Sequence, residues 1–253
     1  MSIVRYRWKS DQYQYRCKKC CTTSSIRTGT FFSKSHLSLQ QIICLTFCWA
    51  AKIPATTTVA MAEVCLSSVC QWYQYLREMC STALIESDDY TLGGDGVVVQ
   101  IDESVVTKRK YHVGRMVPQQ WVFGLYDTVK KIGHIQFVDD RSADTLIPII
   151  QKHVKPGSII FSDQWAAYRR LPDYGYIHKT VNHSENFVDP ETGVCTNAIE
   201  AYWSRVKRQI RLNWLTHRDQ IPLRIDEFLW RERLPSKKIG DVFQQMLLLL
   251  RAK

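Results

Sequence analysis

The stretch VVVQID, residues 97–102, decides the fold, because it places Asp102 in an otherwise apolar run of β-branched side chains. Such side chains favour strands, so the stretch predicts a short strand that carries a carboxylate. Residues 121–126 and 132–138 predict two further strands, separated by turn-forming Asp, Lys and Gly. The three strands are expected to connect as hairpins.

Downstream of these hairpins, helices and strands alternate. The expected order is helix, strand, short helix, strand and helix, over residues 145–154, 158–162, 165–171, 176–181 and 197–212. In the last helix, Ile199, Trp203, Val206 and Ile210 form an apolar stripe at helical spacing. Hairpin strands followed by α/β crossovers are the order of the ribonuclease-H-like fold, an α/β fold with a mixed sheet flanked by helices.

Three acidic residues stand at special places in this order. Asp102 lies on the first strand, Asp163 directly follows the fourth strand, and Glu200 lies one turn into the last helix. Ligand groups of α/β sheets lie at such strand ends, so pairing of the first and fourth strands would bring the aspartates together. Converging carboxylates repel one another, and hard cations such as Mg²⁺ prefer oxygen ligands. Two such ions about 3.5–4 Å apart can catalyse phosphoryl transfer.

Each acid also has a simpler interpretation. Asp102 can be a solvent-facing residue at a strand end, and Asp163 can cap the following helix. Glu200 stands three residues after Asn197, which is the spacing of a capping box. The three acids together, in this order and on these elements, favour a catalytic site.

Basic residues follow Glu200 on the same helix. Lys207 lies seven residues later, so both side chains project from one face. A cation there can hold a DNA phosphate, and the alternative is a solvated surface charge. Arg208 and Arg211, with Arg205, extend the basic surface in a way that suits a phosphate backbone.

The bulk composition agrees with a nucleic-acid partner. The 253 residues carry a formal net charge of +10, which favours an anionic partner, although the charge can also serve solubility alone. The N-terminus shows no secretory signal, and the longest apolar stretch, residues 42–51, is too short to span a bilayer. We therefore expect an intracellular protein without a membrane partner.

The N-terminal third of the chain differs in character from the rest. Residues 1–33 are polar, aromatic and basic and predict a short β-ribbon. Cys17 and Cys20 have zinc-knuckle spacing, but a structural zinc needs four ligands and the chain has no second such pair. Zinc binding at this pair and free thiols both remain open. His36 is the only nearby histidine.

The expected domain boundaries follow changes in composition. Residues 34–82 predict three short helices that resemble a helix-turn-helix DNA-binding region, although an ordinary helical subdomain fits as well. Residues 83–96 are acidic and glycine-rich and predict a linker. Residues 97–235 are the expected catalytic domain, and residues 236–253 a C-terminal helical tail.

Longer segments carry a family resemblance. VVVQIDES (residues 97–104), IIFSDQWAAY (159–168) and VNHSENFVDPETGVCTNAIEAYWSRVK (181–207) resemble Merlin-type DDE transposases and their bacterial insertion-sequence relatives. The resemblance implies that Asp102, Asp163 and Glu200 are the catalytic, metal-binding triad. It also implies that Lys207 is the basic residue that follows the triad in this family. It places two more residues, Asn182 and His183, in a motif loop that contacts DNA or orders the site.

The resemblance also implies partners and cofactors. Such enzymes cut double-stranded DNA at terminal inverted repeats and join the 3′ ends to target DNA, with two Mg²⁺ or Mn²⁺ ions, and we expect a homo-oligomer on DNA. The location is nuclear in a eukaryote and cytoplasmic in a bacterium. Relatives carry a zinc ribbon with two cysteine pairs, of which only Cys17 and Cys20 are present here, so the resemblance implies that residues 1–33 are an incomplete zinc ribbon. Two alternatives are a host-adopted DNA-binding protein without catalysis and a nuclease that cuts without joining.

Overall fold

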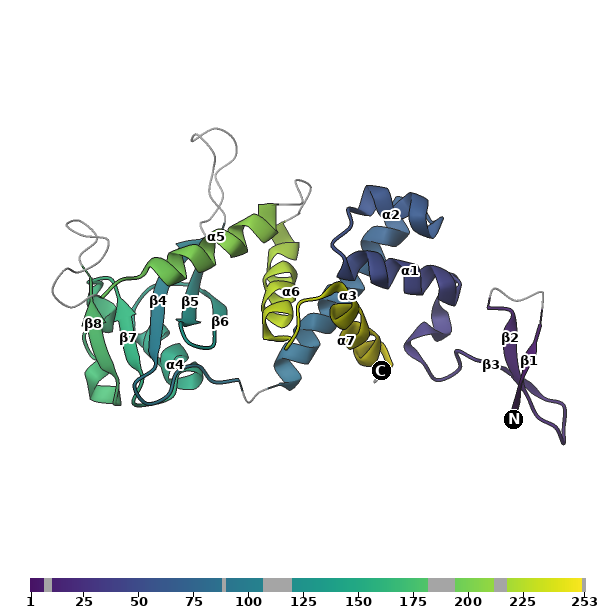
Figure 1. Ribbon diagram of the computed structural model, residues 1–253, viewed down its shortest axis with the longest axis horizontal. Helices are drawn as coiled ribbons and strands as arrows, with labels where there is room; N and C mark the ends of the chain where they lie inside the picture. The colour runs from purple at the N-terminus through teal and green to yellow at the C-terminus, as the bar shows by residue number, and fades with distance from the viewer. Residues whose placement is uncertain (7–10, 88–89, 107–119, 182–193, 212–217, 252–253) are drawn as a thin grey trace. The chain divides into compact units, whose positions relative to one another are not determined.

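A computed structural model describes residues 1–6, 11–87, 90–106, 120–181, 194–211 and 218–251. The chain divides into two compact units, one of residues 1–83 with 234–253 and the other of residues 84–233 (Figure 1). The second unit holds the predicted catalytic segments.

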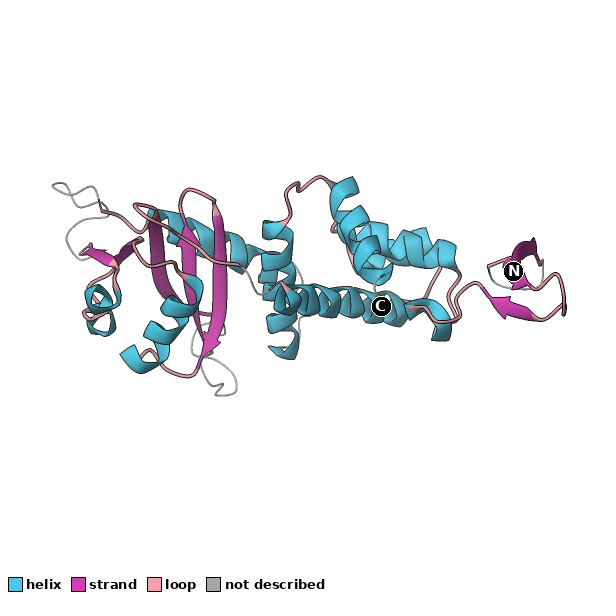
Figure 2. Ribbon diagram, turned by 90° about the horizontal axis from the view of Figure 1, so that it is seen from below, coloured by secondary structure: helices cyan, strands magenta, loops and turns pink. Residues whose placement is uncertain are grey.

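A five-stranded sheet forms the centre of the second unit. Its strands are β4 (Val98–Val105), β5 (Trp121–Asp127), β6 (Ile132–Val138), β7 (Ile159–Ser162) and β8 (Ile177–Thr180). Their order is β6-β5-β4-β7-β8, with β4, β5 and β6 antiparallel and β4, β7 and β8 parallel. Figure 2 shows these strands in magenta with helices beside them. This is the strand order of the ribonuclease-H-like fold, so the predicted fold class is confirmed.

The pairing of β4 with β7 brings two strand ends together. Val98 lies opposite Ile159, and Gln100 lies opposite Phe161. Asp102 and Asp163 each stand two residues further along these neighbouring parallel chains. β4 continues beyond the predicted end to Val105, because its outer residues also pair with β5. Asp102 therefore lies inside a strand and not at its end.

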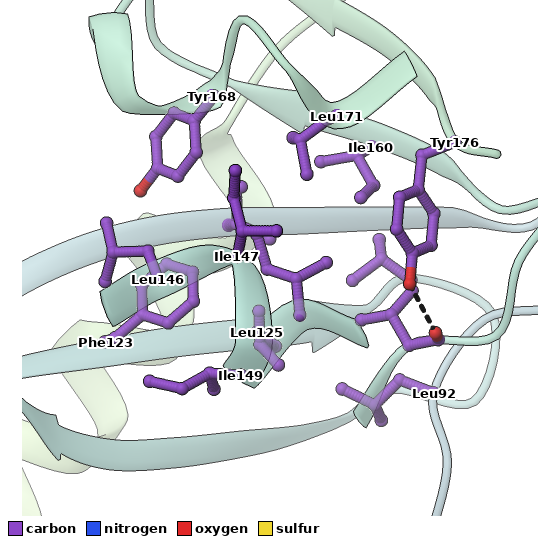
Figure 3. Close-up of a cluster of buried hydrophobic side chains, with 14 of the residues drawn as sticks. Leu92, Phe123, Leu125, Leu146, Ile147, Ile149, Ile160, Tyr168, Leu171 and Tyr176 are labelled. Carbon is purple, nitrogen blue, oxygen red and sulfur yellow. Dashed lines mark hydrogen bonds between the residues drawn. The ribbon is translucent and has the colours of Figure 1, made fainter. Parts of the chain in front are cut away.

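The two faces of the sheet carry separate hydrophobic cores, because side chains alternate along each strand. Helix α4 (Ala143–His153) packs on the core that contains Ile101, Phe123 and Leu146. In this core the Tyr176 hydroxyl donates a hydrogen bond to the Val154 carbonyl at 2.9 Å (Figure 3). Helices α5 (Asn197–Arg211) and α6 (Ile221–Arg233) contribute to the other core.

The apolar stripe of α5 is buried as predicted at three of its positions, Ile199, Trp203 and Val206. Two glycines of the sheet allow the helix to approach closely. A Cβ atom on Gly124 would lie 2.5 Å from the Trp203 ring, and one on Gly133 would lie 2.5 Å from the Tyr202 ring. The glycines are therefore required by packing, because only their missing side chains leave room for these rings.

The first unit combines a small sheet with helices. β1 (Ser2–Arg5), β2 (Tyr13–Arg16) and β3 (Thr23–Ser25) form an antiparallel ribbon. The α-helices are α1 (Leu39–Ala50), α2 (Ala55–Ala62), α3 (Leu66–Glu86) and α7 (Ile239–Arg251). Helix α7 packs on α1, and the rings of Phe47 and Phe243 meet edge to face at 5.7 Å. The C-terminal segment is thus part of the first unit.

The segment predicted as a linker, residues 83–96, differs from expectation. Helix α3 continues to Glu86, because no glycine or proline interrupts the chain before Gly93. Leu92 is fully buried and bridges to Val154, and the Gly93 amide donates to the Asp127 carboxylate at 2.9 Å. The end of this segment therefore belongs to the packed second unit.

Short 3₁₀ helices complete the description. They are η1 (Phe31–Lys34), η2 (Ala166–Tyr168), η3 (Leu171–Tyr174) and η4 (Arg218–Gln220). The single short helix predicted over residues 165–171 is replaced by η2 and η3, because Pro172 begins a new turn. Across the described ranges, no helix combines the length and the apolar character needed to cross a membrane.

Candidate active site

Gln100 fixes the start of α5 against β4. Its side-chain oxygen accepts a hydrogen bond from the Ile199 amide at 3.0 Å, and its side-chain nitrogen donates to the Cys195 carbonyl at 2.8 Å. Amide groups in the first turn of a helix lack hydrogen-bond partners within the helix. The Gln100 side chain supplies the partner for one of these amides, that of Ile199. This contact holds Glu200, the next residue of α5, near the strand that carries Asp102.

Asp102 is oriented by the same helix. The Trp203 indole nitrogen donates a hydrogen bond to Asp102 Oδ2 at 2.9 Å. Trp203 is buried and occupies the space that Gly124 leaves open. A rigid, buried indole therefore determines the orientation of the Asp102 carboxylate.

Asp163 lies at the turn that follows β7. Its Oδ1 accepts a hydrogen bond from the Trp165 amide at 3.0 Å. The Ser162 hydroxyl donates to the Asp163 carbonyl at 2.7 Å and lies 2.8 Å from His178 Nε2. Because the hydroxyl has a single hydrogen, His178 Nε2 is the donor in the second bond. The backbone at Asp163 is thus tied to β8 as well as to β7.

Asp102 feels the charges of both other predicted acids. Burial raises the pKa of Asp102 to about 6, the Trp203 hydrogen bond lowers it, and the charges of Asp163 and Glu200 raise it further. Glu200 is exposed, whereas Asp102 and Asp163 are half-buried. Asp102 therefore lies within electrostatic range of the other two predicted acids. Their catalytic role remains a prediction.

A fourth carboxylate, Glu103, lies beside them. Burial raises its pKa to about 8, the charges of Asp102 and Asp163 add to this, and Arg141 lowers it. The Arg141 guanidinium lies 3.8 Å from Glu103 Oε2, while Glu103 Oε1 is buried without a hydrogen-bond partner among the described residues. The sequence analysis did not identify Glu103, although its position next to Asp102 in an apolar strand was a signal.

The chemical type of these side chains suits a hard divalent cation. All the ligands on offer are carboxylate oxygens, which Mg²⁺ and Mn²⁺ accept. A cation would stabilise the charged form of Asp102, whose pKa is raised by burial and further by the neighbouring acids. Within the ranges that the structure describes, no three His, Cys, Asp or Glu side chains lie close enough together to hold a metal ion.

The predicted DNA-contacting residues fall into two groups. Lys207 and Arg208 lie on α5, with Lys207 half-buried and Arg208 exposed. Asn182 and His183 lie outside the described residues, as does the side chain of Arg211. Arg205 on the same helix is paired with Glu232 at 3.1 Å, so its charge is partly engaged within the fold.

The predicted zinc knuckle lies at the turn between β2 and β3. The Cys21 amide donates to the Cys17 carbonyl at 3.1 Å, and Cys20 is exposed. A hydrogen bond with Thr22 lowers the pKa of the Cys20 thiol to about 7. No third metal-binding side chain joins Cys17 and Cys20 among the residues described, so the structure supplies only the cysteine pair.

Comparison with known proteins places this site in a family context. Residues 83–233, more than half of the chain, match the family model of the ISXO2-like transposase domain. An uncharacterized transposase-like protein of Haemophilus influenzae is 31% identical over 94 residues, which cover 37% of this chain and 75% of that protein.

Two solved structures are also similar. The catalytic core domain of HTLV-2 integrase in complex with magnesium is 15% identical, with a TM-score of 0.36, over 55% of this chain and 86% of that chain. The catalytic core domain of BIV integrase is 12% identical, with a TM-score of 0.34, over 51% of this chain and 80% of that chain.

Proposed function

The chain belongs to the ISXO2-like transposase domain family, and we propose that it is a DDE transposase of the Merlin type. In this proposal it cuts double-stranded DNA at terminal inverted repeats and joins the 3′ ends to target DNA. The observation that carries the proposal is the pairing of β4 with β7, which makes Asp102 and Asp163 neighbours. Glu200 joins them on the helix that Gln100 anchors.

Asp102, Asp163 and Glu200 are the residues that would hold two Mg²⁺ or Mn²⁺ ions. When bound, such ions supply Lewis-acid stabilisation of the attacking and leaving oxygens in phosphoryl transfer. Glu200 is exposed on the first turn of α5 and would be the third carboxylate ligand. Trp203 would keep Asp102 oriented, because its indole is buried and bonded to the carboxylate.

Basic side chains of α5 are proposed to hold the DNA strand beside these acids. Lys207 projects from the same face of the helix as Glu200, and Arg208 is exposed one residue further on. Phosphate contacts of this kind position the strand without reading its bases. We assign the same task to Arg211, and we assign DNA contact or ordering of the site to Asn182 and His183.

The first unit is proposed to recognise the transposon ends. Helix α2 and helix α3 are joined by a tight turn in which Glu63 adopts a left-handed conformation with φ of 53°, an arrangement that resembles a helix-turn-helix unit. Ser67 and Gln71 are exposed at the start of α3. Two such units in a homo-oligomer would engage both transposon ends.

The decisive experiment uses the genomic DNA that flanks the gene. Purified protein is incubated with Mg²⁺ and a duplex that carries the inverted repeats found there, and the products are resolved as nicked, cut and strand-transferred DNA. The proposal is supported if the natural protein cuts and joins the DNA and the Asp163→Asn variant does neither. Cutting without joining identifies a nuclease, and binding without cutting identifies a DNA-binding protein that lacks catalysis.

A further inference from the structure

Arg141 is enclosed between two indole rings at the catalytic end of the sheet. Its guanidinium carbon lies 4.2 Å from the ring centroid of Trp121 and 4.8 Å from that of Trp165. Trp121 begins β5, Arg141 precedes α4, and Trp165 follows β7. Three elements distant in sequence therefore contribute to one stack, and each contact of this kind is attractive.

The stack is held in place by further bonds. The Trp165 indole nitrogen donates to the Arg141 carbonyl at 3.1 Å, and the Trp165 amide donates to Asp163 Oδ1 at 3.0 Å. The Arg141 guanidinium also lies 3.8 Å from Glu103 Oε2. Trp165 is thus fixed at its backbone, at its ring nitrogen and on one ring face.

Despite these bonds, Trp165 remains open to solvent. Its exposed fraction is 41%, although the Arg141 guanidinium lies over one ring face. A rigid, exposed aromatic ring is a preformed stacking surface, because little conformational freedom is lost when a ligand binds to it. Nucleic-acid bases stack on such rings without regard to sequence, and a neighbouring arginine strengthens the contact.

The position of the ring identifies the ligand. Trp165 stands two residues after Asp163, which the proposed function places at the phosphate that reacts. A DNA strand with a phosphate at the acids carries the adjoining base within reach of the indole. The base must be unpaired, since a base inside a duplex is already stacked on both faces.

We propose that Trp165, supported by Arg141 and Trp121, is a stacking platform for an unpaired base of the DNA strand beside the active site. This inference rests on the proposed function and deepens it by assigning a strand-positioning site outside the three acids. The platform favours DNA with frayed or unpaired nucleotides over a continuous duplex.

The test compares two DNA probes of arbitrary sequence. One is a blunt duplex, and the other is the same duplex with two unpaired nucleotides at a 3′ end, the first being 2-aminopurine, whose fluorescence falls on stacking. Trp165→Ala is expected to bind the overhang probe at least about fivefold more weakly than the natural protein and to lose the fluorescence change. Binding of the blunt duplex is expected to stay the same.

Two further variants make the result specific. Trp165→Phe keeps an aromatic face but loses the indole N–H, so it is expected to retain the fluorescence change. Ile177→Ala removes an exposed apolar side chain of the same unit and is expected to change neither probe. Thermal unfolding shows that each variant is folded.

The platform would be overturned if Trp165→Ala and the natural protein bound the overhang probe equally and quenched its fluorescence equally. In that case, binding of the blunt duplex by the natural protein would still leave the proposed function standing. A loss shared equally by Trp165→Phe and Trp165→Ala would also overturn it, because the indole hydrogen bond would then be what matters. If the natural protein binds neither probe, the proposed function and the platform fail together.

Discussion

The substitution Asp102→Asn tests the electrostatic strain of the candidate site. The carboxyl has a pKa of about 6 in the folded protein against a reference value of 3.8. Between these values the folded chain binds more protons than the unfolded chain, so the free energy of unfolding decreases as the pH rises. The stability that protonated Asp102 contributes to the fold is fully present below about pH 4 and is lost above about pH 6. An asparagine does not titrate and does not undergo this loss.

The size of the effect follows from the pKa. Each pKa unit corresponds to about 1.4 kcal/mol, so the charged Asp102 destabilises the fold by about 3 kcal/mol at pH 7. The asparagine oxygen can still accept the Trp203 hydrogen bond. We therefore expect the stability of Asp102→Asn, relative to the natural protein, to increase by about 3 kcal/mol between pH 4 and pH 7.

The measurement is urea unfolding of both proteins at pH 4, 5, 6 and 7, with a chelator present to exclude bound cations. Asp127→Asn is the matched control, because it makes the same change of side chain at another carboxylate of the same unit. The buried Asp127 carboxylate accepts backbone hydrogen bonds from Gly93, Val129 and Lys130. That control is expected to destabilise the fold by about 1–3 kcal/mol. A stability difference for Asp102→Asn that is independent of pH would refute the reasoning, since burial and the neighbouring acids would then not raise the pKa of Asp102.

Three other substitutions test separate parts of the structure. Asp163→Asn is expected to abolish cleavage of repeat ends while leaving DNA affinity nearly unchanged in a mobility-shift assay, and an equal loss of binding would make Asp163 a folding residue. Lys207→Ala is expected to reduce the slope of log affinity against log salt by about one, whereas an unchanged slope with unchanged activity would leave Lys207 as a surface charge. Gly124→Ala drives a Cβ atom to 2.5 Å from the buried Trp203 ring and is expected to lower the free energy of unfolding by about 1–3 kcal/mol. Gly240→Ala, which meets no atom within 4 Å, is its control, and equal stability of the two variants would contradict the packing argument.

Local patterns were enough to predict the sheet and its helices. β-branched runs marked the strands, and the stripe of Ile199, Trp203 and Val206 marked α5, because both signals depend on near neighbours in sequence. The length of α3 could not be read in the same way. Polar and acidic residues after Met79 resemble a helix end, yet the helix continues to Glu86.

The acids of the site were also predictable, whereas their supports were not. Asp102 interrupts an apolar strand, and this is visible in the sequence. Its bond to Trp203 joins residues 101 positions apart, and the Gln100 bond to the Ile199 amide spans 99 positions. Such pairs leave no periodic trace, so Trp203 was identified only as a core residue. The same holds for Arg141, whose two indole partners come from the start of β5 and from the turn after β7.

The packing of α7 on α1 has a consequence for synthesis of the chain. The buried face of α7, formed by Val242, Met246 and Leu250, is made only after all of residues 84–233 have been translated. At about 5–20 residues per second, the N-terminal helices wait about ten to thirty seconds for this partner. During that time α1 lacks its packing partner, including the ring contact between Phe47 and Phe243. A ribosome that stops early would thus release a first unit with an uncovered apolar face, a substrate for chaperones and proteases.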